Sequence, residues 1–274
     1  IVLDPLLIFG LGPIPAMGVA GAAIATVAAQ AVVTLLFLVH AVKSPLLKPV
    51  RIFSRVDWAC MRDIVKIGGP SAVQQMIFAG VSMVIARMVA VFGDAAVAVQ
   101  RVGSQIESIS WMTCDGFSAA LSSFVAQNHG AGNLYRAKKG YHTSLLILSI
   151  WGALCSAVLI VFPAPLFRIF IPEASILPMG IDYLMILGVS QLFMCLEGIA
   201  SGAFSGFGKT LPPSVVGVVL TAARIPAAMW LSNTALGLNG IWWSITLSSV
   251  LKGVVLVFLF QLFERRIQKG RAEI

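Results

Sequence analysis

Long apolar runs separated by short polar connections dominate this chain. A helix needs about 20 mostly apolar residues to cross the hydrocarbon core of a bilayer. Residues 1–12 look like the end of one such run, and seven full-length runs follow. We predict these runs at residues 17–42, 63–92, 95–127, 143–171, 179–205, 211–236 and 237–263. The pattern predicts an all-α polytopic membrane protein.

Two of these runs, 63–92 and 95–127, are longer than a single span requires. A hydrophobic helix that exceeds the bilayer thickness tilts, bends or projects from it. Gly68, Gly69 and Pro70 lie near the start of the first of these runs. Because proline removes a helical hydrogen bond and glycine loosens the backbone, we predict a distortion of the helix at this point.

Composition supports the bilayer as the main solvent. Hydrophobic residues make up 58% of the chain and charged residues 11%, whereas about 25% is usual for charged residues in a soluble domain. The formal net charge of +8 could suggest a nucleic-acid partner. The basic residues lie in short connections between apolar runs, however, so we predict a lipid bilayer and no nucleic acid as the partner of this surface.

The basic residues alternate between successive connections. Fourteen of them lie in the connections 43–66, 128–142 and 206–210 and in the C-terminal tail, whereas the alternate connections hold only Arg168. Cationic loops remain in the cytoplasm of a bacterial cell. We therefore predict that the loops 43–62, 128–142 and 206–210 and the C-terminus are cytoplasmic, and that the protein lies in the inner (plasma) membrane.

A short motif occurs twice, 219 residues apart: Gly18-Val-Ala-Gly21 and Gly237-Leu-Asn-Gly240. A charged residue and a proline precede each copy, as Asp4-Pro5 and as Arg224-Ile-Pro226. Repeated helix groups are typical of secondary transporters. We predict the C-terminal part of a larger two-lobed transporter, divided into the end of the first lobe (1–42), a basic linker (43–62), a second six-helix lobe (63–263) and a cytoplasmic tail (264–274). Trp58 in the linker suggests a short helix at the membrane interface.

Ionisable side chains at membrane depth are costly and mark candidate functional sites. In the run 95–127, a stripe of polar and aromatic residues recurs at helical spacing: Ser104, Glu107, Trp111, Cys114, Asp115 and Ser118. Such a stripe should face a water-filled cavity or another helix. We predict Glu107 and Asp115 as ion-coupling carboxylates. The alternative for Glu107 is a buried pair with Arg101 or Arg224 that fixes helix packing.

Glu197 is the third predicted ion-coupling carboxylate, since it lies in the middle of the run 179–205. The alternative is a hydrogen bond to a neighbouring helix, in a segment where Gly198, Gly202 and Gly206 allow close approach. The residues predicted to line a substrate cavity are Gln74, Gln75, Ser104, Trp111 and Met194. Trp111 would offer its π face to an organic cation. Interhelical hydrogen bonds by the glutamines and simple packing by the methionine are the alternatives.

Patterns typical of enzymes and metal sites do not occur in the sequence. The segment Gly206-Phe-Gly208-Lys209-Thr210 has Ala203 where a phosphate-binding loop requires glycine. The four cysteines are scattered, and no Ser-His-Asp or Glu-x-x-His pattern surrounds the histidines. We predict a protein that is not an enzyme and needs no cofactor besides a coupling ion, H⁺ or Na⁺.

Three stretches resemble the multidrug and toxic compound extrusion (MATE) transporters, particularly their prokaryotic branch. They are Leu3–Gly10 with Met17–Thr26, Phe124–Asn133, and Glu197–Pro213 with Arg224–Pro226. The resemblance implies a twelve-helix protein of two six-helix lobes, acting as a monomer, that exports small organic cations against H⁺ or Na⁺ by alternating access. Residues 63–263 would form the whole second lobe. The chain departs from the family at Gln74 and Gln75, where many members carry an acid.

Three other functions compete with this interpretation. A lipid-linked saccharide flippase with a related two-lobe fold would need a strongly basic cavity, and basic residues at mid-depth are few. A polytopic membrane enzyme would need a nucleophile or a metal set near the interface. A membrane receptor or scaffold would not need the repeat or the buried carboxylates.

Overall fold

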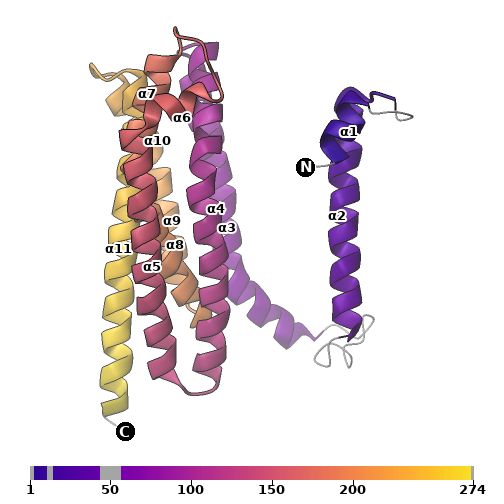
Figure 1. Cartoon of the computed structure of the whole chain (residues 1–274). Coiled ribbons are helices and arrows are strands. Elements are labelled where there is room, and N and C mark those ends of the chain that lie inside the picture. The colour runs from indigo at the N-terminus through magenta and orange to yellow at the C-terminus, as the bar shows by residue number, and fades with distance from the viewer. Residues whose placement is uncertain (1–2, 11–14, 44–56, 273–274) are drawn as a thin grey trace. The chain divides into compact units, whose positions relative to one another are not determined.

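The computed structural model describes residues 3–10, 15–43 and 57–272, and every regular element in this part of the chain is an α-helix. The elements form two compact units, Ile1–Asp57 and Trp58–Ile274. The helices, labelled in Figure 1, are α1 (Leu3–Phe9), α2 (Gly18–Lys43), α3 (Trp58–Ala90), α4 (Asp94–Gly130), α5 (Leu134–Val161), α6 (Pro163–Arg168), α7 (Leu177–Gly188), α8 (Gln191–Gly206), α9 (Leu211–Ala222), α10 (Arg224–Ser232) and α11 (Leu238–Ala272).

The predicted all-α membrane fold is confirmed. Among the described residues, five helical segments are long and apolar enough to cross a membrane, and the bent pair α7–α8 makes a sixth. These segments are α2, α3, α5, α9 with α10, and α11. The run predicted at 95–127 does form one helix, α4, but this helix is not among the apolar segments. It is the helix that carries Glu107 and Asp115.

The connection predicted at 128–142 is wrong in extent. Helix α4 continues to Gly130 and α5 begins at Leu134. Gly132, with φ of +73°, turns the chain, and the Asn133 side chain accepts a hydrogen bond from the backbone N–H of Arg136 at 3.1 Å. This cap starts α5 early. Hydropathy alone assigns the basic first turns of this helix to a loop, because they are polar. In the same way, α11 continues through Ala272, within the predicted tail 264–274.

Helix α3 contains Pro70 without interruption of the helix. Figure 1 shows that the first turns of α3 splay away from its remainder, in agreement with the predicted distortion. Trp58 begins this long helix, so the short separate helix predicted around it is wrong. Most of the predicted linker 43–62, residues 44–56, lies outside the described residues.

Two of the predicted runs are broken helices. The run 179–205 divides into α7 and α8, which meet at a 40° bend at residues 189–190. The run 143–171 divides into α5, which ends at Val161, and the short helix α6, which begins at Pro163. The run 211–236 remains one apolar segment, Leu211–Ser232, through α9 and α10. At such a break, some backbone N–H and C=O groups lose their helical hydrogen-bond partners, and the side chains that follow point in a new direction within the membrane bundle. The bends therefore decide which residues reach the centre of the C-terminal unit.

Helix α8 packs closely against α4 through glycines, as predicted. A Cβ atom at Gly198 would collide with the Cys114 thiol, and one at Gly202 would collide with Ser118. The Ser118 hydroxyl donates to the carbonyl of Gly198 at 2.8 Å. Small residues at such a crossing let two backbones approach and a hydroxyl bond across the helices. Helix α8 also contacts α5 and α11 and so forms the centre of the bundle.

The two copies of the glycine motif have the same local geometry. Gly18 begins α2 with a φ of +55°, and Gly237 directly precedes α11 with a φ of +50°; both values favour glycine. A Cβ at Gly21 would meet the carbonyl oxygen of Leu7, and one at Gly240 would meet that of Leu231. Each copy thus packs a long helix tightly on the short helix that precedes it.

The close approach at Gly240 leads to a stability prediction. In the intact protein, Gly240→Ala should lower the free energy of unfolding by about 1–3 kcal/mol, because the new methyl group overlaps a backbone carbonyl. Gly80→Ala on α3, where nothing lies within 4 Å of the new Cβ, is the matched control. Thermal midpoints followed by size-exclusion chromatography measure both. Equal midpoints for the two variants would contradict the proposed packing constraint.

Candidate functional site

Glu107 of α4 lies inside the C-terminal unit with only 7% of its surface exposed. The Tyr183 hydroxyl donates to its Oε1 at 2.5 Å, and the Gln191 amide donates to its Oε2 at 3.0 Å. Each carboxylate oxygen therefore has a neutral hydrogen-bond donor. Hydrogen bonds to an ionised acceptor are stronger than neutral ones and offset part of the cost of burying the charge.

The bend between α7 and α8 aims both donors at Glu107. Tyr183 comes from α7, and its ring packs on Gly103, one turn before Glu107, where no larger side chain would fit. The ring also meets Trp242 of α11 edge to face, with centroids 5.0 Å apart. Gln191 is the first residue of α8, and its amide also donates to the carbonyl of Leu187 at 3.2 Å. Both donors are thus fixed in position before any ligand arrives.

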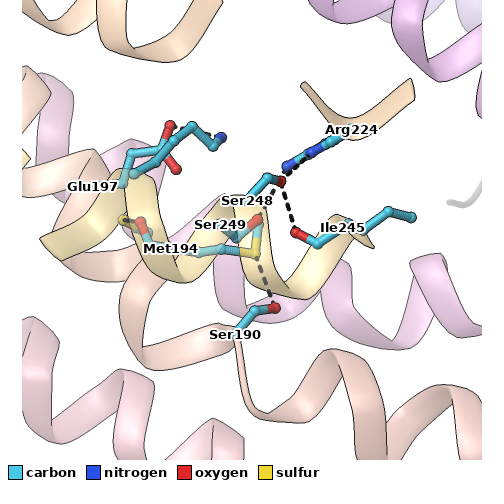
Figure 2. A network of polar contacts seen from close by, with 9 residues as sticks. Ser190, Met194, Glu197, Arg224, Ile245, Ser248 and Ser249 are labelled. Atoms are coloured by element: carbon cyan, nitrogen blue, oxygen red, sulfur yellow. Dashed lines mark hydrogen bonds and ion pairs between the residues drawn. The ribbon is translucent and has the colours of Figure 1, made fainter. Parts of the chain in front are cut away.

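A partly buried ion pair joins α8 to α11. The Lys252 ammonium lies 2.9 Å from Oε1 of Glu197, and the side chains are 8% and 18% exposed. Figure 2 shows Glu197 in the same polar interior as Ser190, Met194 and the residues of α11. Separating such a pair would leave a charge in a poorly solvated place, so the contact connects the two helices strongly.

Arg224, the first residue of α10, is the second buried cation of the unit, 8% exposed. Its Nε donates to the Ser248 hydroxyl at 2.5 Å and its Nη2 to the Ser249 hydroxyl at 3.0 Å (Figure 2). The Ser248 hydroxyl in turn donates to the carbonyl of Ile245 at 2.9 Å. The guanidinium carbon lies 5.9 Å from the centre of the Phe78 ring, within the range of a cation–π interaction.

The predicted polar stripe of α4 divides between two environments. Glu107 and Cys114 are buried against α7 and α8, and Ser118 bonds to α8. Ser104, Trp111 and Asp115 are exposed, with 39% of Trp111 accessible. Helical spacing predicts that all six residues lie on one side of α4. It does not predict which part of that side is covered by neighbouring helices. The structure therefore brings Glu107 inside the unit and leaves Asp115, Trp111 and Ser104 on its surface.

The other predicted cavity residues are also separated. Met194 lies in the interior, with its sulfur 3.9 Å from the Ser190 hydroxyl that donates to it (Figure 2). The amide of Gln74 packs on Gly217 of α9, and Gln75 is exposed. Neither glutamine contributes a hydrogen bond to the network around Glu107 and Arg224 in the part of the chain that the structure describes.

Glu107 does not form the pair with Arg101 or Arg224 that was the alternative prediction. Its hydrogen-bond partners among the described residues are Tyr183 and Gln191, which the sequence analysis did not single out. Their spacing of eight residues would place them almost on one face of a straight helix. In the structure they come from opposite sides of the bend between α7 and α8, and hydropathy gives no signal of that bend.

The MatE family model matches residues 70–230, more than half of the chain and including the whole of α4 and α8. The chain belongs to the MatE family. A probable multidrug resistance protein NorM of Thermotoga maritima is 29% identical to it over 97% of this chain and 58% of the relative. An FAD transporter of Shewanella oneidensis is 27% identical over 95% of this chain and 58% of the relative. The chain thus spans 58% of the length of these two MatE relatives.

Solved MATE structures share the fold. The crystal structure of a MATE transporter in the straight conformation superposes with a TM-score of 0.83 at 24% identity, over 98% of this chain and 60% of that one. A multidrug resistance MATE transporter in an outward-facing conformation gives a TM-score of 0.80 at 24% identity, over the same shares of the two chains. At this level of identity the structural likeness establishes the fold and leaves the roles of individual residues to the geometry above.

The Tyr183–Glu107 contact leads to a prediction for a double-mutant cycle. Tyr183→Phe and Glu107→Leu in the intact protein should show a coupling free energy of about 1 kcal/mol, since each substitution removes one partner of the same hydrogen bond. Unfolding in sodium dodecyl sulfate, followed by tryptophan fluorescence, measures the four variants of the cycle. Strictly additive effects would contradict the direct hydrogen bond.

The Lys252–Glu197 pair leads to a second prediction. Lys252→Met leaves the Glu197 carboxylate without its counter-ion and should lower the free energy of unfolding by about 2 kcal/mol, less than for a fully buried pair because Glu197 is partly exposed. The double variant Glu197→Gln with Lys252→Met should recover most of this loss. The same unfolding assay measures both variants, and an equally unstable double variant would show that the cost is one of packing instead of charge.

Proposed function

We propose that this chain forms the second lobe of a MatE efflux transporter, which exchanges small molecules for an ion by alternating access. The MatE match and the shared fold support a transporter, and the buried charges support a site at membrane depth. The apolar helices and the basic connections support a multi-pass protein of the inner membrane. We propose that it acts as a monomer and is not an enzyme.

Glu107 is the proposed coupling carboxylate. It is buried, and its hydrogen-bond partners Tyr183 and Gln191 are neutral, so gain or loss of a proton changes the net charge at this point. Glu197, by contrast, is already neutralised by Lys252. A group that moves between charged and neutral forms inside a bundle shifts the balance between two conformations, because only one of them solvates the charge well.

The proposed coupling ion is H⁺. Sodium is a hard cation that is coordinated by several oxygen atoms. Tyr183 and Gln191, however, both present hydrogen-bond donors to Glu107. Among the described residues no group of three or more His, Cys, Asp or Glu side chains could hold a metal ion. Protonation of the carboxylate needs only a reorientation of the Tyr183 hydroxyl, so the existing contacts suit a proton better than a metal cation.

The proposed substrates are amphipathic organic cations. Asp115 and Trp111 both lie on the exposed side of α4, and a carboxylate next to an aromatic face suits an organic cation. The printed names of the relatives include multidrug resistance proteins and an FAD transporter, so family membership alone leaves the charge of the substrate open. The relatives offer less support for the lipid-linked saccharide flippase.

The assay for this proposal uses everted membrane vesicles that contain the intact transporter. An imposed proton gradient should drive uptake of a fluorescent organic cation such as ethidium, and a sodium gradient should not. Glu107→Gln should reduce proton-driven uptake to the level of vesicles without the transporter, since the amide cannot bind and release a proton.

The matched control is Glu173→Gln, which neutralises an exposed carboxylate between α6 and α7 and should leave uptake unchanged. Both variants are first compared by size-exclusion chromatography, to confirm equal amounts of folded protein. Unimpaired uptake by Glu107→Gln would remove Glu107 from the mechanism, and uptake driven by sodium alone would contradict proton coupling.

A further inference from the structure

A pocket opens between α5, α7 and α11, near the end of the bundle opposite to the C-terminus, where Figure 1 places α6 and α7. Its volume is about 350 Å³, which is within the usual range for sites that bind small molecules. The side chains that line it include Ile160 of α5, Asp182, Met185 and Val189 of α7, and Asn239 and Trp243 of α11. None of these belongs to the network around Glu107 and Arg224, so the pocket is separate from the candidate functional site.

The pocket lies at the edge of the apolar spans. The apolar segment of α5 ends at Val161, one residue after Ile160, and that of α11 begins at Leu238, one residue before Asn239. Tryptophan, here Trp243, is enriched at this level of a membrane, because its ring contacts apolar chains while its N–H reaches polar groups. The pocket therefore meets the membrane where lipid headgroups join their acyl chains.

The α7 wall of the pocket changes from polar to apolar along the chain. Asp182, Met185 and Val189 follow one another at spacings of three and four residues and are all exposed, so they form one continuous surface. Val189 lies about 10 Å further into the bundle than Asp182, at a rise of about 1.5 Å per residue. A ligand that follows this wall has a charged group at one end and an apolar chain at the other, which is the polarity of a membrane lipid.

The polar end of the pocket favours a cation. Asp182 is the only charged side chain among the described residues that line it. The Asn239 amide donates to Oδ2 of Asp182 at 3.2 Å, whereas Oδ1 accepts no hydrogen bond within the described part of the chain. The amide thus holds the carboxylate in place and leaves one oxygen for a ligand. A primary ammonium can donate to this oxygen, whereas a quaternary ammonium has no N–H and an anionic headgroup is repelled.

We propose that this pocket binds a membrane phospholipid whose headgroup carries a primary ammonium, such as phosphatidylethanolamine. The ammonium donates to Oδ1 of Asp182, and the first part of an acyl chain lies along Met185 and Val189, which are 43% and 39% exposed. The rest of the lipid stays in the bilayer. This lipid site goes beyond the proposed transport function and does not depend on it.

The test compares three lipids with identical palmitoyl and oleoyl chains. Native mass spectrometry of the purified intact protein in detergent measures the binding of added phosphatidylethanolamine, phosphatidylcholine and phosphatidylglycerol. The protein should bind one phosphatidylethanolamine at least about tenfold more tightly than either of the others, as expected for one charge-assisted hydrogen bond. The choline headgroup has the same charge but no N–H, and the glycerol headgroup has no cation.

Two variants locate the site. Asp182→Asn should lower the affinity for phosphatidylethanolamine to that for phosphatidylcholine, and because Asp182 is exposed the substitution leaves the core unchanged. Val189→Trp fills the apolar part of the pocket and should also weaken binding of phosphatidylethanolamine. The matched control is Glu173→Gln, which neutralises an exposed carboxylate outside the pocket and should leave all three affinities unchanged.

Three results would overturn the proposal. They are equal affinities of the wild-type protein for the three lipids, an unchanged preference for phosphatidylethanolamine in Asp182→Asn, and displacement of the bound lipid by an equal concentration of glycerophosphoethanolamine. The last compound carries the same headgroup without acyl chains, so it should not compete if the apolar wall contributes to binding. Because these measurements involve no transport, they succeed or fail independently of the vesicle assay.

Discussion

Buried charge is the constraint on which the C-terminal unit depends. Glu107, Arg224 and Lys252 are buried in one helical bundle and Glu197 is partly buried there, so each charge loses much of its hydration. Lys252 neutralises Glu197 directly, whereas Glu107 and Arg224 are each held by neutral groups from other helices. The helix breaks, the glycine contacts and the serines of α11 all serve to bring these partners within hydrogen-bonding distance.

The same arrangement would let the proposed transporter lobe be both stable and responsive. The tight glycine contacts of α8 against α4 and of α11 against α10 fix the backbone of the bundle. Within it, gain of a proton by Glu107 changes the net charge next to the bend between α7 and α8. A local charge change beside an interrupted helix is a recurring way to bias two conformations of a transporter. We regard the bend as the element that responds to Glu107.

Sequence reasoning predicted the all-α fold and the places of Glu107 and Glu197 within the bundle, and its alternative for Glu197 included the close approach of Gly198 and Gly202 to a neighbouring helix. It also predicted Asp115 at the same depth, whereas this side chain is exposed. These features follow from hydropathy, from the cost of intramembrane charge and from side-chain size. The bend before Gln191, the cap at Asn133 and the burial boundary between Glu107 and Trp111 could not be predicted in this way. They depend on local backbone geometry and on where the neighbouring helices lie, and a single sequence does not specify either.

The most direct test of this account is the number of protons released when a substrate binds. Purified intact protein in weakly buffered detergent solution, titrated with ethidium, should release about one proton for each dye bound, because binding of the cation favours the conformation in which Glu107 is ionised. Glu107→Gln should bind the dye without releasing a proton. Equal proton release from the wild type and from Glu107→Gln would contradict a coupling role for this carboxylate.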